Sequence, residues 1–322
     1  MIANEISSRE DQRPVVSVIM PTFNSTRTIV RALKSVLSQT YQDFEIIIAD
    51  DASKDDTRQQ IATVVDPRIS FLESPEISNK GPAPTRNRAL AKARGTYIAF
   101  LDSDDEWFPE KLERQVRFLE SYPLCSLVVS NAYDVAPDGK IIETEFDAAP
   151  AIDGAEAWRT LLKYSFIETS SVMTRRSLVD ELGRFDPKLL VSQDQDLWIR
   201  LALRGEVGVI REILGKIHQV PTGHMNRNYR RHANFLLPMI EGHVARQRDR
   251  LSQREVDDIL GQRYQVAGRN LFLHGHFLLG LRLLMRACSH NGNWFRNLLY
   301  VCQANPPALA LKKAIRAQRK SA

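Results

Sequence analysis

The stretch Asp102-Ser103-Asp104-Asp105 places three carboxylates within four residues. It follows the apolar run 97–101, whose residues favour strands, so the carboxylates are expected where a buried strand reaches the surface. Crowded carboxylates repel one another and resist burial, and a divalent cation removes that cost. Oxygen ligands suit Mg²⁺ or Mn²⁺ rather than zinc, and these ions often complete their shell with phosphate oxygens. The pattern therefore predicts a site for a metal ion and a nucleotide.

The same acids have a plainer interpretation, as the N-cap of a helix near Pro109. An Asp side chain can accept hydrogen bonds from the free N–H groups of a first helical turn. Asp105 suits that role. For Asp102 and Asp104, the strand before them favours the metal–nucleotide site.

Composition indicates an ordinary globular chain, because 322 residues with 43% hydrophobic and 26% charged side chains are enough for one large domain and an appendage. Cys125, Cys288 and Cys302 are widely spaced, which argues against a disulfide framework or zinc site and fits a reducing compartment. We expect neither a signal peptide nor a spanning helix, because no segment approaches about 20 apolar residues. The net charge of +5 is concentrated after Arg227, which suggests an anionic partner surface.

Strand and helix signals alternate through the N-terminal half, which indicates a mainly parallel sheet covered on both faces. Four short apolar runs predict buried strands, at 15–20, 44–49, 68–72 and 97–101. Helices are expected at 28–37 and at 84–94, the latter closed by Gly95. A further short helix is expected after Ser53 and Asp55, which are candidate caps.

Polar residues follow three of these strands at the point where each ends. In such sheets ligands bind beyond the carboxyl ends of the strands, so a shared site is expected there. Neither GxGxxG nor GxxxxGK[ST] follows the first strand, so neither a Rossmann dinucleotide site nor a P-loop is supported. The residues are Thr22 and Asn24, Asp50 and Asp51, and Asp102 and Asp104.

Five blocks in a fixed order carry a family resemblance. They read VSVIMPTFN (16–24), SQTYQDFEIIIADDAS (38–53), NKG with TRN and ARG (79–95), LDSDD (101–105), and GRFD with DQDLWIR (183–200). Over about residues 14–220 the chain resembles family 2 glycosyltransferases. The resemblance implies a GT-A fold, a nucleotide-diphospho-sugar donor and inversion at the anomeric carbon.

The resemblance also implies roles in donor binding. The loop after the first strand and the acid after the second hold the nucleoside, Asp102 contacts the nucleoside side, and Asp104 binds the metal. Asp51 has the alternative of capping a turn, and Arg86 the alternative of a solvated helix charge. The implied donor-binding residues are Pro21, Thr22, Phe23, Asn24, Asp50, Asp51, Arg86, Asp102 and Ser103.

Asp194 matches the family's general base, which takes the proton of the attacking acceptor hydroxyl. The family commonly has Glu before the base, whereas Gln193 stands here. Asp196 is interpreted as a first-turn acid favoured by the helix dipole. Trp198 is either part of an acceptor platform or core.

His218 roughly matches a later Arg-x-His element of the family, with Lys216 in place of the arginine. It is a candidate contact for metal or pyrophosphate, although a lone loop histidine is more often structural. His224 is its rival.

The chain is thus predicted to be an α/β protein with a GT-A fold and a C-terminal helical region. We divide it into a flexible N-terminal segment (1–13), a nucleotide-sugar-binding half (14–122), an acceptor-binding half (123–225) and a helical, basic C-terminal region (226–322). In the acceptor half we expect strands at 125–133, 141–144 and 170–174 and a helix at 155–163. The last region is either a helical subdomain or a membrane-interfacial patch, with helices at 257–273, 277–288 and 294–301.

The predicted function is metal-assisted, inverting transfer of a sugar from a nucleotide diphosphate to an acceptor hydroxyl, in bacterial surface polysaccharide or glycolipid assembly. A UDP-sugar donor, a glycan or lipid-linked acceptor, a divalent cofactor (Mn²⁺ or Mg²⁺) and an anionic membrane surface are the expected partners, at the cytoplasmic face of the plasma membrane. Two alternatives remain, a metal-dependent nucleotidyltransferase and a non-catalytic nucleotide- or nucleic-acid-binding module. Nucleic acid is not expected, because acid-bearing strand ends would repel its phosphates.

Overall fold

A computed structural model describes residues 13–75, 77–144, 146, 152–219 and 229–291. The chain divides into two compact units, one comprising Met1–Leu161 and Ser165–Gly223 and the other Leu162–Tyr164 and His224–Ala322. The segments 1–13 and 294–301, for which flexibility and a helix were expected, lie wholly or almost wholly outside the described residues.

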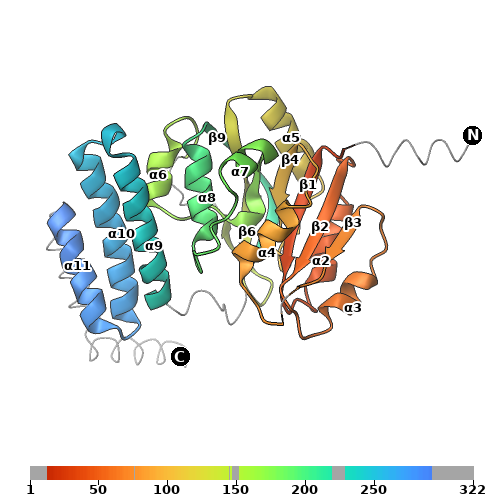
Figure 1. Ribbon diagram of the computed structural model, residues 1–322, viewed down its shortest axis with the longest axis horizontal. Coiled ribbons are helices and arrows are strands. Elements are labelled where there is room, and N and C mark those ends of the chain that lie inside the picture. The colour runs from red at the N-terminus through yellow and green to blue at the C-terminus, as the bar shows by residue number, and fades with distance from the viewer. Residues whose placement is uncertain (1–12, 76, 145, 147–151, 220–228, 292–322) are drawn as a thin grey trace, which may run out of the picture. The chain divides into compact units, whose positions relative to one another are not determined.

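The first unit is built on a sheet of nine strands within the described residues, in the order β3-β2-β1-β4-β8-β6-β9-β5, with β7 paired to β6 (Figure 1). Pairs β3-β2, β2-β1, β1-β4 and β6-β9 are parallel; the others are antiparallel. The strands are β1 (Val16–Thr22), β2 (Phe44–Asp50), β3 (Ile69–Leu72), β4 (Tyr97–Phe100), β5 (Glu106–Trp107), β6 (Cys125–Val135), β7 (Ile141–Thr144), β8 (Val172–Arg175) and β9 (Glu206–His218).

The strands predicted from apolar runs all form, with ends shifted by a few residues. Two strands were not expected. β5 has only two residues, and β9 mixes apolar and charged side chains, so neither shows the continuous apolar run that marks a buried strand. Together they extend the sheet past the antiparallel β8.

Both faces of the sheet are covered because side chains alternate along each strand. Val18 and Ile46 belong to a core that also contains Leu33 of α2 (Ile29–Leu37) and Val116 of α5 (Lys111–Ser121). On the opposite face, Phe100 packs edge-on against Phe185 and against Trp198 of α8 (Gln193–Ala202), with ring centroids 5.5 and 5.3 Å away. Trp198 is therefore core, the second of its two interpretations.

The remaining helices of this unit connect the strands. Two start signals differ from expectation: α3 begins after Asp56, and α4 begins at Pro82 after Gly81. These helices are α3 (Thr57–Ala62), α4 (Pro82–Leu90), α6 (Ala157–Lys163, whose last residues belong to the second unit), α7 (Arg176–Glu181) and the 3₁₀ turn η1 (Thr169–Ser171).

The second unit consists of α9 (Tyr229–Arg246), the short turn η2 (Arg248–Arg250), α10 (Gln253–Leu273) and α11 (Phe277–Asn291), drawn side by side in Figure 1. α10 begins earlier than predicted because Ser252 and Glu255 form a capping box. Leu237, Tyr264 and Leu283 belong to the small core of this unit. Within the described part of the chain, no helix has both the length and the apolar content needed to cross a membrane.

Gly95 allows the chain to approach β1 before it enters β4. Its backbone N–H donates to Ser17 Oγ at 2.8 Å, and a Cβ at this position would lie 2.5 Å from the Ser17 backbone nitrogen. We expect Gly95→Ala to lower the free energy of unfolding by about 1–3 kcal/mol, because backbone must shift to relieve the contact. Thermal unfolding measures this.

Gly242→Ala is the matched control. Its Cβ would meet only the flexible end of Arg246, at 3.4 Å, in the interior of α9. Alanine is the better helix former, so this variant should unfold at or above the wild-type temperature. Equal destabilisation by both substitutions would show that Gly95 has no special role.

Candidate active site

The carboxyl ends of β1 and β2 lie side by side because the two strands are parallel and in register from Val16 opposite Phe44 to Thr22 opposite Asp50. The chain continues this pairing, since the Asp51 N–H donates to the Thr22 carbonyl at 2.9 Å. Thr22 is buried, and its hydroxyl has no hydrogen-bond partner among the described residues. The predicted nucleoside-binding residues of these strands are thus neighbours.

Asn24 and Asp50 are joined through Ser53. Ser53 donates to the Asp50 carboxylate from its backbone N–H, at 3.0 Å, and from its hydroxyl. The Asn24 N–H donates to Ser53 Oγ at 2.9 Å, and Lys54 N–H donates to Asn24 Oδ1 at 2.8 Å. Asn24 has a φ of +50°, which asparagine tolerates better than most residues. Ser53, expected as a helix cap, instead orders this loop.

Asp51 makes the hydrogen bonds expected of a turn cap. Its side chain is buried, and its two carboxylate oxygens accept from the N–H groups of Lys80 and Gly81, each at 2.9 Å. By contrast, Phe23 at the end of β1 is 43% exposed, and Pro21 is half-buried. An exposed aromatic ring at this edge is available for stacking on a planar base.

Arg86 reaches the acidic stretch from α4. Its Nη2 lies 2.6 Å from Asp102 Oδ1, and its side chain is only 5% exposed, which argues against a solvated helix charge. Nε and Nη1 have no partner among the described residues. Ser103 Oγ lies 2.8 Å from Ser25 Oγ, which connects the acidic stretch to the loop after β1. The ends of β1 and β4 therefore meet as predicted from strand order.

Asp105 does not cap the next helix. It is buried, and its carboxylate accepts from Ser170 Oγ at 2.5 Å and from the His218 N–H at 2.9 Å. Burial, followed by the charges of Asp104 and Asp102, raises its pKa well above the usual value. The N-cap of α5 is Glu110. Asp105 instead joins η1 and the end of β9 to the acidic stretch.

Asp104 is the acid whose charge is least compensated. Burial and then the neighbouring Asp102 raise its pKa to about 6, against the smaller opposing effects that include the charges of Arg31 and Arg86. Arg31 donates to the backbone carbonyl of Asp104 rather than to its carboxylate. A partly buried carboxylate that resists ionisation gains from a bound cation. The residues present therefore fit a divalent ion at Asp104.

His218 lies at the end of β9, directly beside this stretch. Its Nε2 is 3.1 Å from Glu106 Oε1, and the same carboxylate oxygen lies 3.0 Å from Lys216 Nζ. Burial lowers the pKa of His218, which favours the neutral ring required of a metal ligand. Its contact with Glu106 also fits the structural alternative. His224 lies outside the described residues.

A preformed cage of ligands is not present: within the described ranges, no three His, Cys, Asp or Glu side chains are grouped so that they could hold a metal ion. This arrangement suits Mg²⁺ or Mn²⁺, because protein sites for such ions commonly use one or two carboxylates and complete the shell with phosphate oxygens and water.

Asp194 occupies the second position of α8. Thr169 Oγ1 donates to its Oδ2 at 3.3 Å, which ties it to η1. Asp196, two residues later in the same helix, is buried and forms an ion pair with Arg200 at 2.7 Å. Gln193 is also buried. Asp196 is thus held in a structural contact, whereas Asp194 stays half-exposed near η1.

Glu168, which the sequence patterns did not indicate, directly precedes η1. Although the residue as a whole is exposed, burial of its carboxyl raises its pKa, and the charges of Asp194 and then Asp102 raise it further. The negative charges of the proposed base and of the strand-end acids therefore both act on the Glu168 carboxyl. A single acid in an irregular segment has no spacing signal, so only its placement before η1 could have suggested it.

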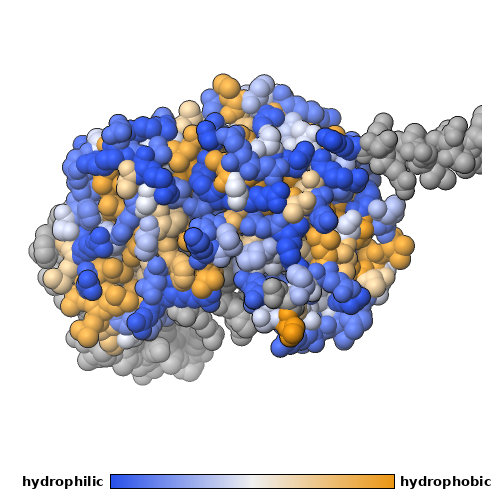
Figure 2. All heavy atoms as spheres, in the orientation of Figure 1, coloured by the Kyte–Doolittle hydropathy of each residue, from blue (hydrophilic) through white to orange (hydrophobic). Residues whose placement is uncertain are grey.

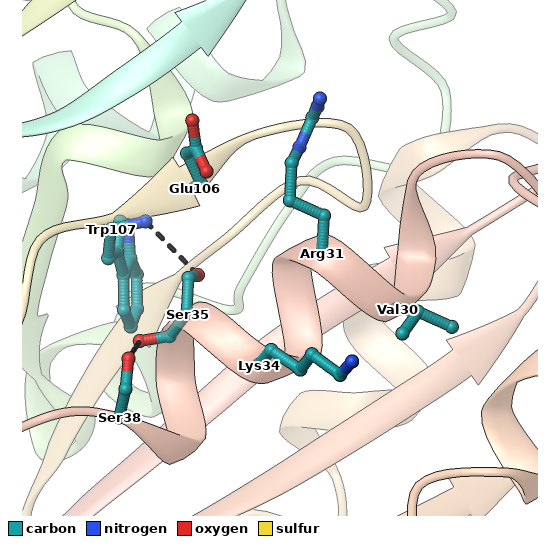
Figure 3. A pocket seen from close by; sticks show the side chains of 7 residues that line it. All are labelled: Val30, Arg31, Lys34, Ser35, Ser38, Glu106 and Trp107. Carbon is teal, nitrogen blue, oxygen red and sulfur yellow. Dashed lines mark hydrogen bonds between the residues drawn. The ribbon is translucent and has the colours of Figure 1, made fainter.

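A shallow cavity of about 590 Å³ opens between α2 and β5 (Figure 3). Arg31 and Glu106 project on the same side of it, and the backbone N–H of Trp107 donates to Ser35 Oγ at 3.1 Å. None of the candidate donor-binding or catalytic side chains lines it, so the site rests on the strand ends and not on this cavity. Its lining residues are Val30, Arg31, Lys34, Ser35, Ser38, Glu106 and Trp107.

The sheet order and the acids at the strand ends are those of a GT-A fold, and comparison with solved structures agrees. Staphylococcus aureus TarS residues 1–349 in complex with UDP is 20% identical with a TM-score of 0.55, covering 84% of this chain and 88% of that one. A Pyrobaculum calidifontis mannosyltransferase in complex with GDP-Man and Mn²⁺ has a TM-score of 0.60 at 20% identity, covering 96% and 81%. At these identities the likeness concerns the fold.

The sequence comparisons show the family. Residues 17–183 match Glycosyl transferase family 2, and the chain belongs to this family. It is 34% identical to an Escherichia coli UDP-Glc:α-D-GlcNAc-diphosphoundecaprenol β-1,3-glucosyltransferase over 66% of this chain and 80% of that protein. A putative teichuronic acid biosynthesis glycosyltransferase of Bacillus subtilis is also 34% identical, over 60% and 74%. An uncharacterised Rickettsia conorii glycosyltransferase is 32% identical over 67% of this chain, which spans only 35% of that relative.

These findings confirm the predicted family, the α/β GT-A fold with a C-terminal helical region, and the assignment as a glycosyltransferase. The comparisons thus favour glycosyl transfer over the nucleotidyltransferase and the non-catalytic module. The roles of individual site residues stay predictions.

We expect Asp104→Asn to abolish metal-dependent donor binding while the fold is kept. A metal ligand should matter at least as much as its outer-shell partners, whose loss costs about 10- to 100-fold in metal affinity. Because the pKa of Asp104 is raised, its ionised form destabilises the metal-free protein above about pH 6, and this cost disappears as the carboxyl is protonated below that pH. The variant should therefore melt at a higher temperature than wild type at pH 7.5, with the gain shrinking towards pH 4.

Calorimetric titration with UDP, with and without Mn²⁺, measures the first effect, and thermal unfolding across pH measures the second. Asp138→Asn, at an exposed hairpin position, is the control for the titration and should leave metal-dependent UDP affinity unchanged. Metal-dependent UDP affinity equal to wild type would remove Asp104 from the site.

Proposed function

We propose that the chain transfers a sugar from a nucleotide diphosphate to an acceptor hydroxyl by direct, inverting displacement assisted by a divalent ion. The observation that supports this proposal most is that η1 links the two groups of acids: Thr169 Oγ1 donates to Asp194 Oδ2 at 3.3 Å, and Ser170 Oγ donates to Asp105 Oδ2 at 2.5 Å. Direct displacement requires a donor site and a general base on opposite sides of the reacting carbon.

A UDP-sugar is the donor we favour. The Escherichia coli relative is named for UDP-Glc, and TarS was solved with UDP and with UDP-GlcNAc. In this chain, Asp50 offers a half-buried carboxylate as a hydrogen-bond acceptor, and Asn24 offers an amide as donor and acceptor. Phe23, next to Asn24 in the chain, has an exposed ring. A carboxylate can accept from the ring N–H of uracil, and guanine offers one as well, so GDP-sugars form the comparison set.

Asp104, with His218 as a second candidate ligand, would hold the divalent ion. When bound, such an ion would neutralise the charge that develops on the departing diphosphate. Arg86 fixes Asp102 beside it through the 2.6 Å ion pair. Asp105 holds η1 and the end of β9 in place through Ser170 and His218.

Asp194 is proposed as the general base that removes the proton from the acceptor hydroxyl. Its hydrogen bond with Thr169 restricts the carboxylate, and it lies in the first turn of α8. Asp196 is unsuitable, because its carboxylate is engaged by Arg200.

The acceptor is proposed to be lipid-linked, in the assembly of bacterial surface polysaccharide on the cytoplasmic side of the plasma membrane. The name of the Escherichia coli relative specifies a diphosphoundecaprenol acceptor, and other relatives are named for teichuronic acid and succinoglycan biosynthesis. A soluble glycan acceptor is the alternative for the same site.

The proposal is tested first with a panel of UDP- and GDP-sugars, each assayed for Mn²⁺-dependent thermal stabilisation and for hydrolysis. We expect stabilisation by one nucleotide class and only with the metal present. Stabilisation that is the same for every nucleotide, or independent of metal, would contradict the proposed donor site.

Asp194→Asn should eliminate transfer while donor affinity stays near wild type, because the base acts on the acceptor proton in the transition state. Loss of general-base help alone typically costs about 10²–10⁴-fold in rate. Transfer is measured at saturating donor and acceptor, and UDP affinity by calorimetry.

Asp138→Asn again serves as the control and should leave the rate unchanged. If Asp194→Asn retained more than about a tenth of the wild-type rate, it would fall outside the range expected for a lost base, and the role would pass to Glu168 or another acid.

A further inference from the structure

The solvent side of α11 carries apolar side chains in a regular stripe. Leu278, Leu281 and Met285 are spaced by three and four residues, so they share one face of the helix, and they are 87%, 39% and 56% exposed. The opposite face is buried in the helical unit and includes Leu283 and Ala287. A surface helix normally turns polar residues to water, so this face has the composition of a covered surface.

The stripe continues into the turn between α10 and α11. Leu273 and Phe277 are exposed on either side of this turn, and Phe277 meets Phe272 edge-on at 5.2 Å between ring centroids. Figure 2 shows hydrophobic atoms gathered at the lower left, around the ends of α10 and α11. We refer to Leu273, Phe277, Leu278, Leu281 and Met285 as the α11 face.

Basic residues outnumber acids around the α11 face. Residues 259–291 contain four Arg and no Asp or Glu, and the acids that contact α11 are Glu241 and Asp257, from the neighbouring helices. Arg282 lies on the exposed side of α11 with the stripe. Arg286 is also exposed, although Glu241 lies 3.5 Å away and the Tyr264 ring lies 4.4 Å below its guanidinium. The surface that covers this face must therefore tolerate both hydrocarbon and positive charge.

We propose that the α11 face docks on an anionic lipid surface, with its apolar stripe in the region between headgroups and acyl chains and its arginines among the headgroup phosphates. Helices with this combination of exposed Leu, Phe and Arg lie in the membrane interface without spanning it. Each basic residue near an anionic surface adds to the attraction, within a Debye length.

Other occupants fit the same observations less well. A second copy of the chain would bring two surfaces of like charge together. A nucleic acid would be held by arginines but would gain little from exposed Leu and Met side chains, since its binding rests on phosphate contacts and stacking on aromatic rings. A bilayer with anionic headgroups satisfies both parts of the face.

Docking of the α11 face would bring the enzyme to the surface at which a lipid-linked acceptor is presented. Only this purpose rests on the proposed function. Binding to vesicles and chemistry at the strand ends are separate measurements. An enzyme that binds vesicles but fails to transfer sugar would contradict the proposed function and leave the α11 face intact.

The test uses the full chain and co-sedimentation with vesicles of phosphatidylglycerol and phosphatidylcholine, and with vesicles of phosphatidylcholine alone, at low and high salt. The variant is Leu278→Glu with Met285→Glu, which places two acids on the stripe at exposed positions. We expect at least about a tenfold lower partition onto the anionic vesicles, with unchanged donor hydrolysis. Wild-type binding should weaken on pure phosphatidylcholine and at high salt.

A matched control places the same two charges elsewhere. Val65 and Leu124 are 94% and 74% exposed in the first unit, so Val65→Glu with Leu124→Glu changes net charge equally without touching α11. This control should lose far less vesicle binding. Arg282→Glu, which leaves the apolar stripe intact, should weaken binding at low salt only.

Equal pelleting of wild type and the Leu278/Met285 variant would overturn the proposal. So would equal losses in the variant and the control, because net charge alone would then explain binding. A variant that lost donor hydrolysis or melted several degrees lower would show that the stripe serves folding. Salt-sensitive binding of wild type to single-stranded RNA, but not to vesicles, would replace lipid with nucleic acid.

Discussion

Repulsion among carboxylates is the constraint around which this site is arranged. Asp102, Asp104 and Asp105 leave the sheet together, and burial makes their mutual repulsion stronger than it would be in water. The fold compensates two of them: Arg86 pairs with Asp102, and the Ser170 hydroxyl and His218 N–H bond Asp105. The charge of Asp104 is offset only in part, by Arg31 and Arg86, which is why it is the acid suited to a cation.

The compensating groups come from distant parts of the chain, so the sheet must be complete before the site exists. Ser170 precedes β8, which pairs antiparallel with β4, and His218 ends β9, which pairs with β5. The antiparallel half of the sheet thus returns the chain to the acidic stretch. A strand order that ended at β4 would leave Asp105 buried without partners, at a cost of several kcal/mol for an ionised group.

Apolar runs predicted the parallel strands and their polar ends because strand period and burial are local properties of sequence. The contacts that distinguish one acid from another are not local. Thr169 with Asp194, Arg31 with the Asp104 carbonyl, and Ser170 with Asp105 join residues 25 to 73 positions apart and share no spacing. Asp105 was consequently taken for a helix cap, and Glu168 was missed. The family motifs located the acids in the sequence, but only the tertiary structure shows which carboxylates have an ion-pair or hydrogen-bond partner.

The unpaired state of Asp104 has a consequence for the order of binding. Within the described residues no three ligating side chains meet, so the protein alone offers a cation too few ligands. A diphosphate alone would face Asp102 and Asp104, whose negative charges Arg31 and Arg86 offset only in part. Each ligand therefore supplies what the other lacks, and by linkage each must raise the affinity of the other equally. We infer that cation and donor bind as a pair, each raising the affinity of the enzyme for the other.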